Sequence, residues 1–392
     1  MAVVQDDMTN TFDLVIRAGR VVDPAQGIDG PGQIAVRGDR IAVTAVVDDQ
    51  SEPQTLNAPT VLSFPDGVLL PGLVDMHSHP DVAESRIGIE PDTHILARGV
   101  TTVLSQGDVG AQNMTTYRQA VIERTQLRIR LAINLAASGE TKPYPSFGTL
   151  GDADVNACIE AIHTDKDLIW GVAVNVCEIV CGDTDPREIL RRAIRVGEQT
   201  NRPLLVGTRL ALDFPLDELL KQLRPGDMVT YCFHNFPDRL EHEGHVMDCV
   251  WDARERGVLF DIGHGMGSFD FNVAETVIRD GFLPDTISTD KHQRHLRLDP
   301  QHDLPRTVSK LLAAGMQERD VWPRVTTRPA ELLGLSGEIG TLASGSCADL
   351  VVLTRTSSKI DLYDVTGNRR SGFAWNTAAV VRAGEVVVNP TA

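Results

Sequence analysis

Apolar runs of strand length alternate with longer stretches of helical periodicity over roughly residues 72–335, and this alternation constrains the fold more than any other feature. The apolar runs are TTVLSQG, RLAINLAA, IWGVAVNV, RPLLVGT, MVTYCF, VLFDIGHG and DTISTD, with segments such as DPREILRRAIRVGEQ between them. About eight such units in about 260 residues predict an α/β fold of the (β/α)8 TIM-like barrel type. A doubly wound open sheet is the alternative. The barrel is favoured because polar residues collect at the C-terminal ends of the apolar runs, where a barrel assembles its site.

The two ends of the chain carry a different pattern. Short β-type runs broken by Gly, Pro and Asp extend to about Pro71, and the same style returns in ADLVVLT, FAWNTAAVVRAG and EVVVN. We therefore expect both ends to meet in one small β domain. Residues 1–70 and 341–392 form that domain in this interpretation, and residues 71–340 form the barrel.

Charge and cysteine usage exclude several classes of protein. Lys plus Arg number 37 against 54 Asp plus Glu, so a nucleic-acid partner is not expected. The six cysteines form no CxxC pair, which argues against a disulfide framework and a cysteine zinc knuckle. The acidic N-terminus has no signal-peptide core, and no stretch approaches the roughly 20 apolar residues that span a bilayer. We expect a cytoplasmic protein with no membrane partner, and homo-oligomerisation stays open.

The segment PGLVDMHSHP is the strongest local signal of chemistry. His77 and His79 follow an apolar strand with one residue between them. Residues two apart in a strand point to the same face, so both imidazoles can meet one ion at a barrel mouth. Neutral imidazole is a good ligand for zinc and similar ions. A hydrogen-bonded histidine pair at a turn is the alternative, which the position after the first barrel strand disfavours.

The segment DTISTDKH ends the last strand-like run and offers Asp290. A carboxylate at this place can bind the metal and take a proton from a metal-activated water, which is the double task of a hydrolase. An Asp at a strand end is otherwise a helix N-cap. Its pairing with the two histidines favours the functional role, so His77, His79 and Asp290 are the predicted metal ligands and Asp290 the predicted catalytic residue.

Several stretches resemble the amidohydrolase superfamily, and within it the dihydroorotase-like deacetylases. They are DLVIRAGRVVDP, LLPGLVDMHSHP, GVTTVLSQGDVGAQN, VLFDIGHGMGSFDF, DTISTDKH and VTTRPAELLGLSGEIGTLASGSCADLVVL. The resemblance implies a TIM-like barrel that carries the metal, a small β-sandwich domain formed from both chain ends, and hydrolysis of an amide or ester bond in a small-molecule substrate. It also implies that His77, His79 and Asp290 are metal ligands.

The sequence departs from this branch in the second half of its usual two-metal site. The branch adds a carboxylated lysine on the fourth strand and one histidine on each of the next two. The corresponding positions here are Ala173, Gly207 and Tyr231. We therefore expect one divalent ion, with zinc as first choice and manganese or iron as alternatives.

Residues near these positions are candidates for substrate binding. Arg209 shares a strand face with Gly207, where it could hold a substrate carboxylate, polarise a carbonyl, or pair with an acid at the rim. Asn175 shares the face of Ala173, and Glu178 lies beyond the end of the same strand.

Two histidines are further candidates for the substrate pocket. His234 could swing toward the metal, although its offset of three from Tyr231 places it on the opposite face of a regular strand. His264 lies between glycines that permit close backbone approach, and a pocket-lining or hydrogen-bonding role is expected. The histidines expected to be solvated are His94, His163, His242, His245, His295 and His302.

Hydrolysis of an amide, ester, cyclic amide or lactone through a metal-activated water is the leading functional hypothesis. A non-catalytic relative with a structural or ligand-binding role is the alternative that the missing ligands favour. A single-metal deaminase is a third possibility, but such sites usually use a fifth-strand histidine, which Gly207 cannot supply.

Overall fold

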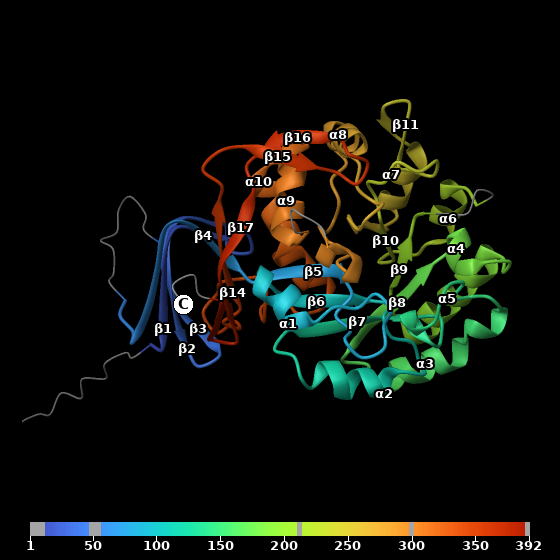
Figure 1. The fold of residues 1–392 in the computed structure, drawn as a ribbon, viewed down its shortest axis with the longest axis horizontal. Helices are drawn as coiled ribbons and strands as arrows, with labels where there is room; N and C mark the ends of the chain where they lie inside the picture. The colour runs from blue at the N-terminus through green and yellow to red at the C-terminus, as the bar shows by residue number, and fades with distance from the viewer. Residues whose placement is uncertain (1–11, 47–55, 210–213, 298–301, 389–392) are drawn as a thin grey trace, which may run out of the picture.

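A parallel sheet forms the centre of the larger domain (Figure 1), in a computed structural model that describes residues 12–46, 56–209, 214–297 and 302–388. Within these residues the strand order is β13-β10-β9-β8-β7-β6-β5. The strands are β5 (Leu73–Ser78), β6 (Val100–Gln106), β7 (Arg128–Asn134), β8 (Ile169–Asn175), β9 (Leu204–Gly207), β10 (Met228–Thr230) and β13 (Leu259–Phe260). The order follows the chain, as expected for a barrel.

The segment 286–291 takes the eighth position of the ring. It forms parallel bridges on both sides, from Thr286 to Asp261 beyond β13 and from Lys291 to Ser78 of β5. These bridges join the two edge strands of the sheet, so the predicted TIM-like barrel is confirmed. The DTISTD run therefore contributes isolated bridges where the sequence predicts a full strand.

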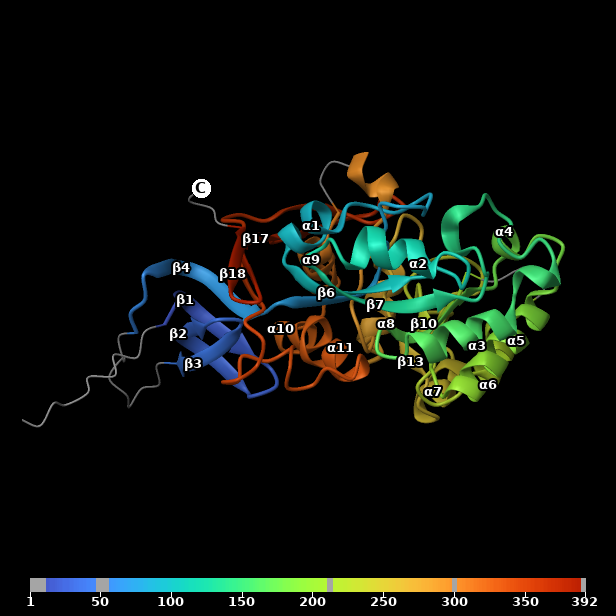
Figure 2. The same cartoon turned by 90° about the horizontal axis from the view of Figure 1, so that it is seen from below.

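Helices surround the parallel sheet (Figures 1 and 2). They are α1 (Pro91–His94), α2 (Met114–Tyr117), α3 (Val155–Thr164), α4 (Glu178–Cys181), α5 (Pro186–Thr200), α6 (Leu216–Gln222), α7 (Asp248–Glu255), α8 (Phe271–Arg279), α9 (Leu304–Ala313), α10 (Glu318–Val321) and α11 (Thr327–Leu332). Short turns of helix are η1 (Leu96–Arg98), η2 (Arg118–Ile122), η3 (Gly139–Thr141), η4 (Leu150–Asp152), η5 (Gln293–Arg297) and η6 (Trp322–Val325). No helix in the described segments is long and apolar enough to cross a membrane.

Helix α5 shows how the sequence sets these elements. Asp185 caps its start by accepting a hydrogen bond from the backbone N–H of Arg187 at 3.0 Å, and Pro186 occupies the first turn. Its buried residues recur at helical spacing on one face. The helix ends at Asn201, which adopts the left-handed conformation that often terminates helices.

Both chain ends contribute to a second sheet, with strand order β18-β17-β14-β4-β1-β2-β3 in the described residues. Its strands are β1 (Leu14–Asp23), β2 (Ile28–Arg37), β3 (Arg40–Val46), β4 (Thr60–Pro71), β14 (Leu350–Arg355), β17 (Trp375–Arg382) and β18 (Glu385–Val388). β4 and β14 pair antiparallel, with Leu69 opposite Val352, so the predicted union of the two ends in one β-sandwich domain is confirmed.

Two small hairpins complete the described structure: β11 (Glu241–His242) with β12 (His245–Val246), and β15 (Ile360–Tyr363) with β16 (Arg369–Gly372). The connection after β15 returns to the barrel, because Asp364 accepts a hydrogen bond from the backbone N–H of Phe271 at 2.9 Å. We propose that residues 1–70 and 341–392 form the sandwich domain around the barrel of residues 71–340, with this connection as an added contact.

Asp349 links the two domains. This buried carboxylate accepts hydrogen bonds from Arg128, at the start of β7, and from Arg382, at the end of β17. It also accepts the backbone N–H of Ala383 at 2.9 Å. The two guanidinium groups and the amide thus compensate one desolvated negative charge at the junction between barrel and sandwich.

Replacing Asp349 by Ala should lower the free energy of unfolding by about 3–5 kcal/mol, because two arginines would lose a buried counter-charge. The measurement is urea denaturation followed by circular dichroism. Asp361→Ala is the control, since its ion pair with Arg369 is exposed and should change stability by less than about 1 kcal/mol. Equal effects of the two substitutions would contradict the assigned role of Asp349.

Candidate metal centre

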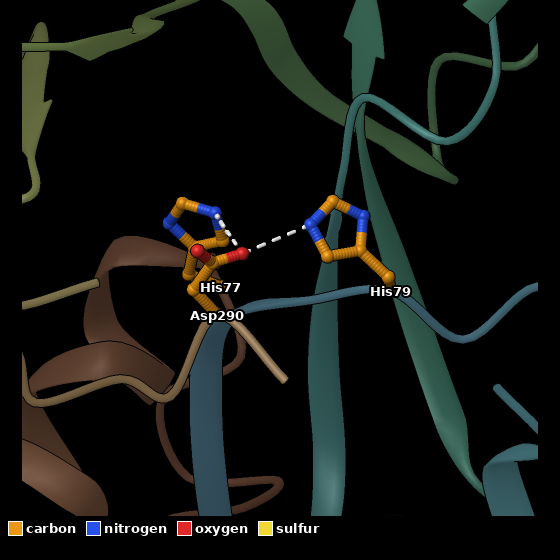
Figure 3. A group of neighbouring side chains, drawn as sticks. All are labelled: His77, His79 and Asp290. Carbon is orange, nitrogen blue, oxygen red and sulfur yellow. Dashed lines mark hydrogen bonds and ion pairs between the residues drawn. The ribbon is translucent and has the colours of Figure 1, made fainter. Parts of the chain in front are cut away.

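Three buried side chains meet at the mouth of the barrel (Figure 3). Asp290 Oδ1 lies 3.4 Å from His77 Nε2 and 3.1 Å from His79 Nε2. All three ligand atoms lie within 4.8 Å of one another, and no other such group occurs among the described residues. Two imidazole nitrogens and a carboxylate oxygen are the donors of many catalytic metal sites, so the residues fit a divalent ion.

The backbone brings these ligands together across the barrel seam. His77 is the penultimate residue of β5, and its carbonyl accepts a hydrogen bond from the Asp290 N–H at 2.7 Å. The N–H of His79 donates to the carbonyl of Lys291 at 3.0 Å. Asp290 adopts φ of 48°, a left-handed conformation that costs a non-glycine residue about 1–3 kcal/mol and is often retained at functional sites.

The close approach of Gly265 to Asp290 accounts for a glycine in the GHG segment, residues 263–265. A Cβ atom at this position would lie 2.3 Å from Asp290 Oδ2, and the residue has a positive φ of 48°. Only glycine therefore allows the close approach of this loop to the Asp290 carboxylate.

Each imidazole is held through its Nδ1 atom. His77 Nδ1 lies 2.9 Å from Thr230 Oγ1, whose hydroxyl donates to Asp261 Oδ2 at 2.8 Å. Because the threonine proton is used in that bond, His77 must donate from Nδ1. His79 Nδ1 lies 2.9 Å from Asp108 Oδ1 and donates to this carboxylate. Each Nε2 atom thereby faces Asp290 Oδ1, and it would bind an ion through its lone pair once it has lost the proton that it donates to that oxygen.

The electrostatic setting suits a charged carboxylate ligand. Burial alone would raise the pKa of Asp290, but the nearby His77 and the hydrogen bonds with His77 and His79 lower it well below its usual range. Burial raises the pKa of Asp75 to about 7. Asp75 accepts hydrogen bonds from the hydroxyl and the N–H of Thr289, which supports the segment that carries Asp290.

A cavity of about 1280 Å³ opens on His79 and Asp290. Of the predicted substrate-binding residues, Arg209, Asn175 and Glu178 line it. Glu140 and Tyr144 of the loop after β7 also line the cavity, and the sequence patterns did not predict them as site residues. Burial raises the pKa of Glu140. The sequence feature that could have indicated Glu140 is the position of GET (residues 139–141) just beyond the end of an apolar strand.

His234 and His264 do not appear in the cavity wall. His234 accepts a hydrogen bond from the N–H of Phe236 at 3.1 Å, and burial, followed by the charge of Arg209, lowers its pKa to about 3. His264 Nδ1 donates to the Gly265 carbonyl at 2.8 Å, and its Nε2 lies 2.9 Å from Lys310 Nζ. The structure thus gives His264 hydrogen bonds that support the loop beside Asp290.

The expected solvation of His295 and His302 is wrong. Both are buried, their rings stack at 4.4 Å, and His302 Nε2 bonds the Thr289 carbonyl at 2.8 Å. These two histidines pack onto the segment that carries Asp290, which local composition did not indicate. His163, His242 and His245 are exposed as expected, and His94 is partly exposed.

The positions that depart from the family pattern are filled by neighbouring side chains. A Cβ atom on Gly207 would lie 2.3 Å from Asn175 Oδ1 and 2.9 Å from Tyr231 Cε2. Ala173 is buried with Leu104 and Leu205 in the barrel interior. A histidine at position 207 would therefore require its neighbours to move.

Replacing Asp108 by Asn should weaken metal binding about 10- to 100-fold, because the amide cannot hold His79 Nδ1 as a charged acceptor. Competition with a chromophoric chelator measures this affinity, and thermal unfolding of the metal-free chain serves as a check on folding. Asp154→Asn, at the start of α3, is the control for loss of a carboxylate elsewhere. Unchanged affinity in Asp108→Asn would show that Asp108 does not support the site.

The chain resembles curated proteins in sequence, although not a family model. No family model matches the chain. A deacetylase of Brucella anthropi is 30% identical over 324 residues, which are 80% of this chain and 79% of the relative. A deacetylase of Enterococcus faecalis is 29% identical over 363 residues, or 92% and 94% of the two chains.

Solved structures agree with these relatives. The crystal structures of an adenine deaminase and of a dihydroorotase each superpose with a TM-score of 0.84 at 27% identity, covering 96% of this chain and 99% of theirs. The resemblance to deacetylases inferred from sequence is therefore confirmed, and the alternative of a non-catalytic relative is not favoured. The chain belongs to the amidohydrolase superfamily as a deacetylase-like, metal-dependent hydrolase.

Proposed function

We propose that the chain removes an acyl group from an amide or ester of a small molecule, using one divalent ion held by His77, His79 and Asp290. The observation that carries this proposal is the convergence of three buried donors at one end of a large cavity. The names of the two deacetylase relatives favour acyl removal over ring opening of a cyclic amide or lactone. Zinc is the first choice for the ion, with manganese or iron as alternatives.

A divalent ion at this site supplies an electrophile that polarises a carbonyl and acidifies a water molecule. The Asp290 carboxylate, whose Oδ1 faces both imidazoles, is the base that takes a proton from the attacking water. The same carboxyl returns that proton to the leaving nitrogen or oxygen as the bond to the acyl carbon breaks. Thr230 and Asp108 keep the two imidazoles in the ligating tautomer throughout.

The cavity wall provides the groups for substrate binding. Arg209 offers a cation, Asn175 an amide and Glu178 an anion, and all three line the cavity. We assign substrate contact to Asn175 and Glu178, and to Arg209 a place in the wall over the ring of Tyr231. His264 and His234, which lie behind the wall, have supporting roles. The cavity volume of about 1280 Å³ is ample for a substrate of ordinary metabolite size.

Metal analysis of the purified chain should find about one ion per chain. His77→Ala and Asp290→Ala should lose both the ion and hydrolysis of a panel of N-acetyl amino acids, aryl acetates, lactones and cyclic imides. His163→Ala, which removes an exposed histidine on α3, should keep both.

Two ions per chain would contradict the single-ion assignment. A folded preparation that binds no ion when zinc, manganese or iron is supplied would contradict the metal site as a whole. Hydrolysis of a lactone or cyclic imide but of no acyl compound would overturn the preference for acyl removal.

A further inference from the structure

Tyr231 lies beside the metal ligands but is not part of the ligand group. It follows β10 with φ of 69°, a left-handed conformation that is rare for an aromatic residue. Its hydroxyl lies 3.4 Å from His77 Nε2, the atom that faces the ion position. The ring is buried, so its orientation is set by the protein and not by solvent.

Two glycines and one arginine determine where this ring lies. A Cβ atom on Gly207 would be 2.9 Å from Tyr231 Cε2, and one on Gly263 would be 3.0 Å from Tyr231 Cδ1. These atoms belong to opposite edges of the ring, so each edge meets a bare backbone. Arg209 covers the ring face, with its Cζ atom 4.3 Å from the centroid, and Arg209 Nε is buried without a hydrogen-bond partner.

The phenol is left with a donor that needs an acceptor. Arg209 is a hydrogen-bond donor to the phenol oxygen, and this bond leaves the phenol proton unused. In the described part of the chain the acceptor within reach of that proton is His77 Nε2, whose lone pair would be taken by a bound ion. A buried O–H without a partner is costly, so with an ion and a substrate bound this proton would need a substrate oxygen beside the ion as its acceptor. In a hydrolase of this class that oxygen is the carbonyl oxygen of the bond being cleaved.

We propose that the Tyr231 hydroxyl donates the hydrogen bond that stabilises the negative charge developing on the substrate's carbonyl oxygen, with Arg209 as the residue that positions its ring. This inference rests on the proposed function. No proton is transferred in this step, since the hydroxyl keeps its hydrogen and only shares it with the oxygen. Tyr231, Asn175 and Arg209 occupy the region where the family pattern would have the second metal's ligands, and the phenol then supplies the polarisation from this side.

Tyr231→Phe is the direct test, because it keeps the ring, its glycine contacts and the stack with Arg209. With phenyl acetate as substrate, kcat should fall about 10²- to 10³-fold and KM should change less than about threefold. Bound metal should stay at the wild-type level. The affinity for phenyl methylphosphonate, a tetrahedral anion that mimics the attacked ester, should fall by a similar factor when measured by calorimetry. Tyr363→Phe makes the same chemical change on exposed β15 and should leave every value unchanged.

Arg209 is tested through its dependence on Tyr231. Arg209→Met should lower kcat about tenfold, and Arg209→Lys should restore most of it, because an ammonium group can still lie over the ring. In the Tyr231→Phe background the same Arg209→Met change should have little further effect on kcat. A full additional loss there would show that Arg209 acts on the substrate independently, and would overturn its positioning role.

The remaining outcomes distinguish failure of this inference from failure of the proposed function. Loss of the ion in Tyr231→Phe would make Tyr231 a metal ligand and overturn the inference. Wild-type kcat and phosphonate affinity in that variant would do the same, as would a metal-loaded wild type that neither cleaves phenyl acetate nor binds the phosphonate. A wild-type chain without metal or activity on any probe would instead refute the proposed function itself.

Discussion

Two backbone hydrogen bonds across the barrel seam create the candidate metal site. The N–H of Asp290 donates to the carbonyl of His77, and the N–H of His79 donates to the carbonyl of Lys291. The segment 286–291 lies more than 200 residues after β5 in the chain, yet these bonds fix its register to within one residue. A shift of one residue would turn the Asp290 side chain away from both imidazoles. The ligand group therefore exists only when the ring is closed.

The seam is supported by polar groups that are buried and satisfied. Asp75 holds Thr289, and Asp261 holds Thr286, Ser288 and Thr230, so carboxylates and hydroxyls take the place of ordinary strand pairing along this segment. Such a network is costly when any member is missing. This explains why a segment with only isolated bridges is nevertheless placed firmly, and why the two histidines have defined tautomers.

The periodicity of the sequence was sufficient to predict the architecture of the barrel. Continuous apolar runs predicted the parallel strands from β6 to β10, and the helical periodicity of DPREILRRAIRVGEQ predicted α5. The pair His77 and His79 could be predicted from the sequence because strand alternation places residues two apart on one face. Asp290 could be predicted because the ends of the strands meet at one rim of a barrel. By contrast, His295 and His302 stand among charged residues that suggest solvent exposure, and only their packing beside the site buries them.

The sequence by itself determined the barrel, the joining of both chain ends in one β domain, and the three candidate ligands, because these depend on local periodicity and spacing. Only the tertiary structure decided which groups surround those ligands. Asp108, Thr230 and Asp261 hold the imidazoles, Tyr231 lies beside His77, and Arg209 covers the tyrosine ring. These neighbours come from different strand ends, and their contacts depend on barrel closure and on the left-handed turns at Tyr231 and Asp290, which no local pattern in the chain encodes.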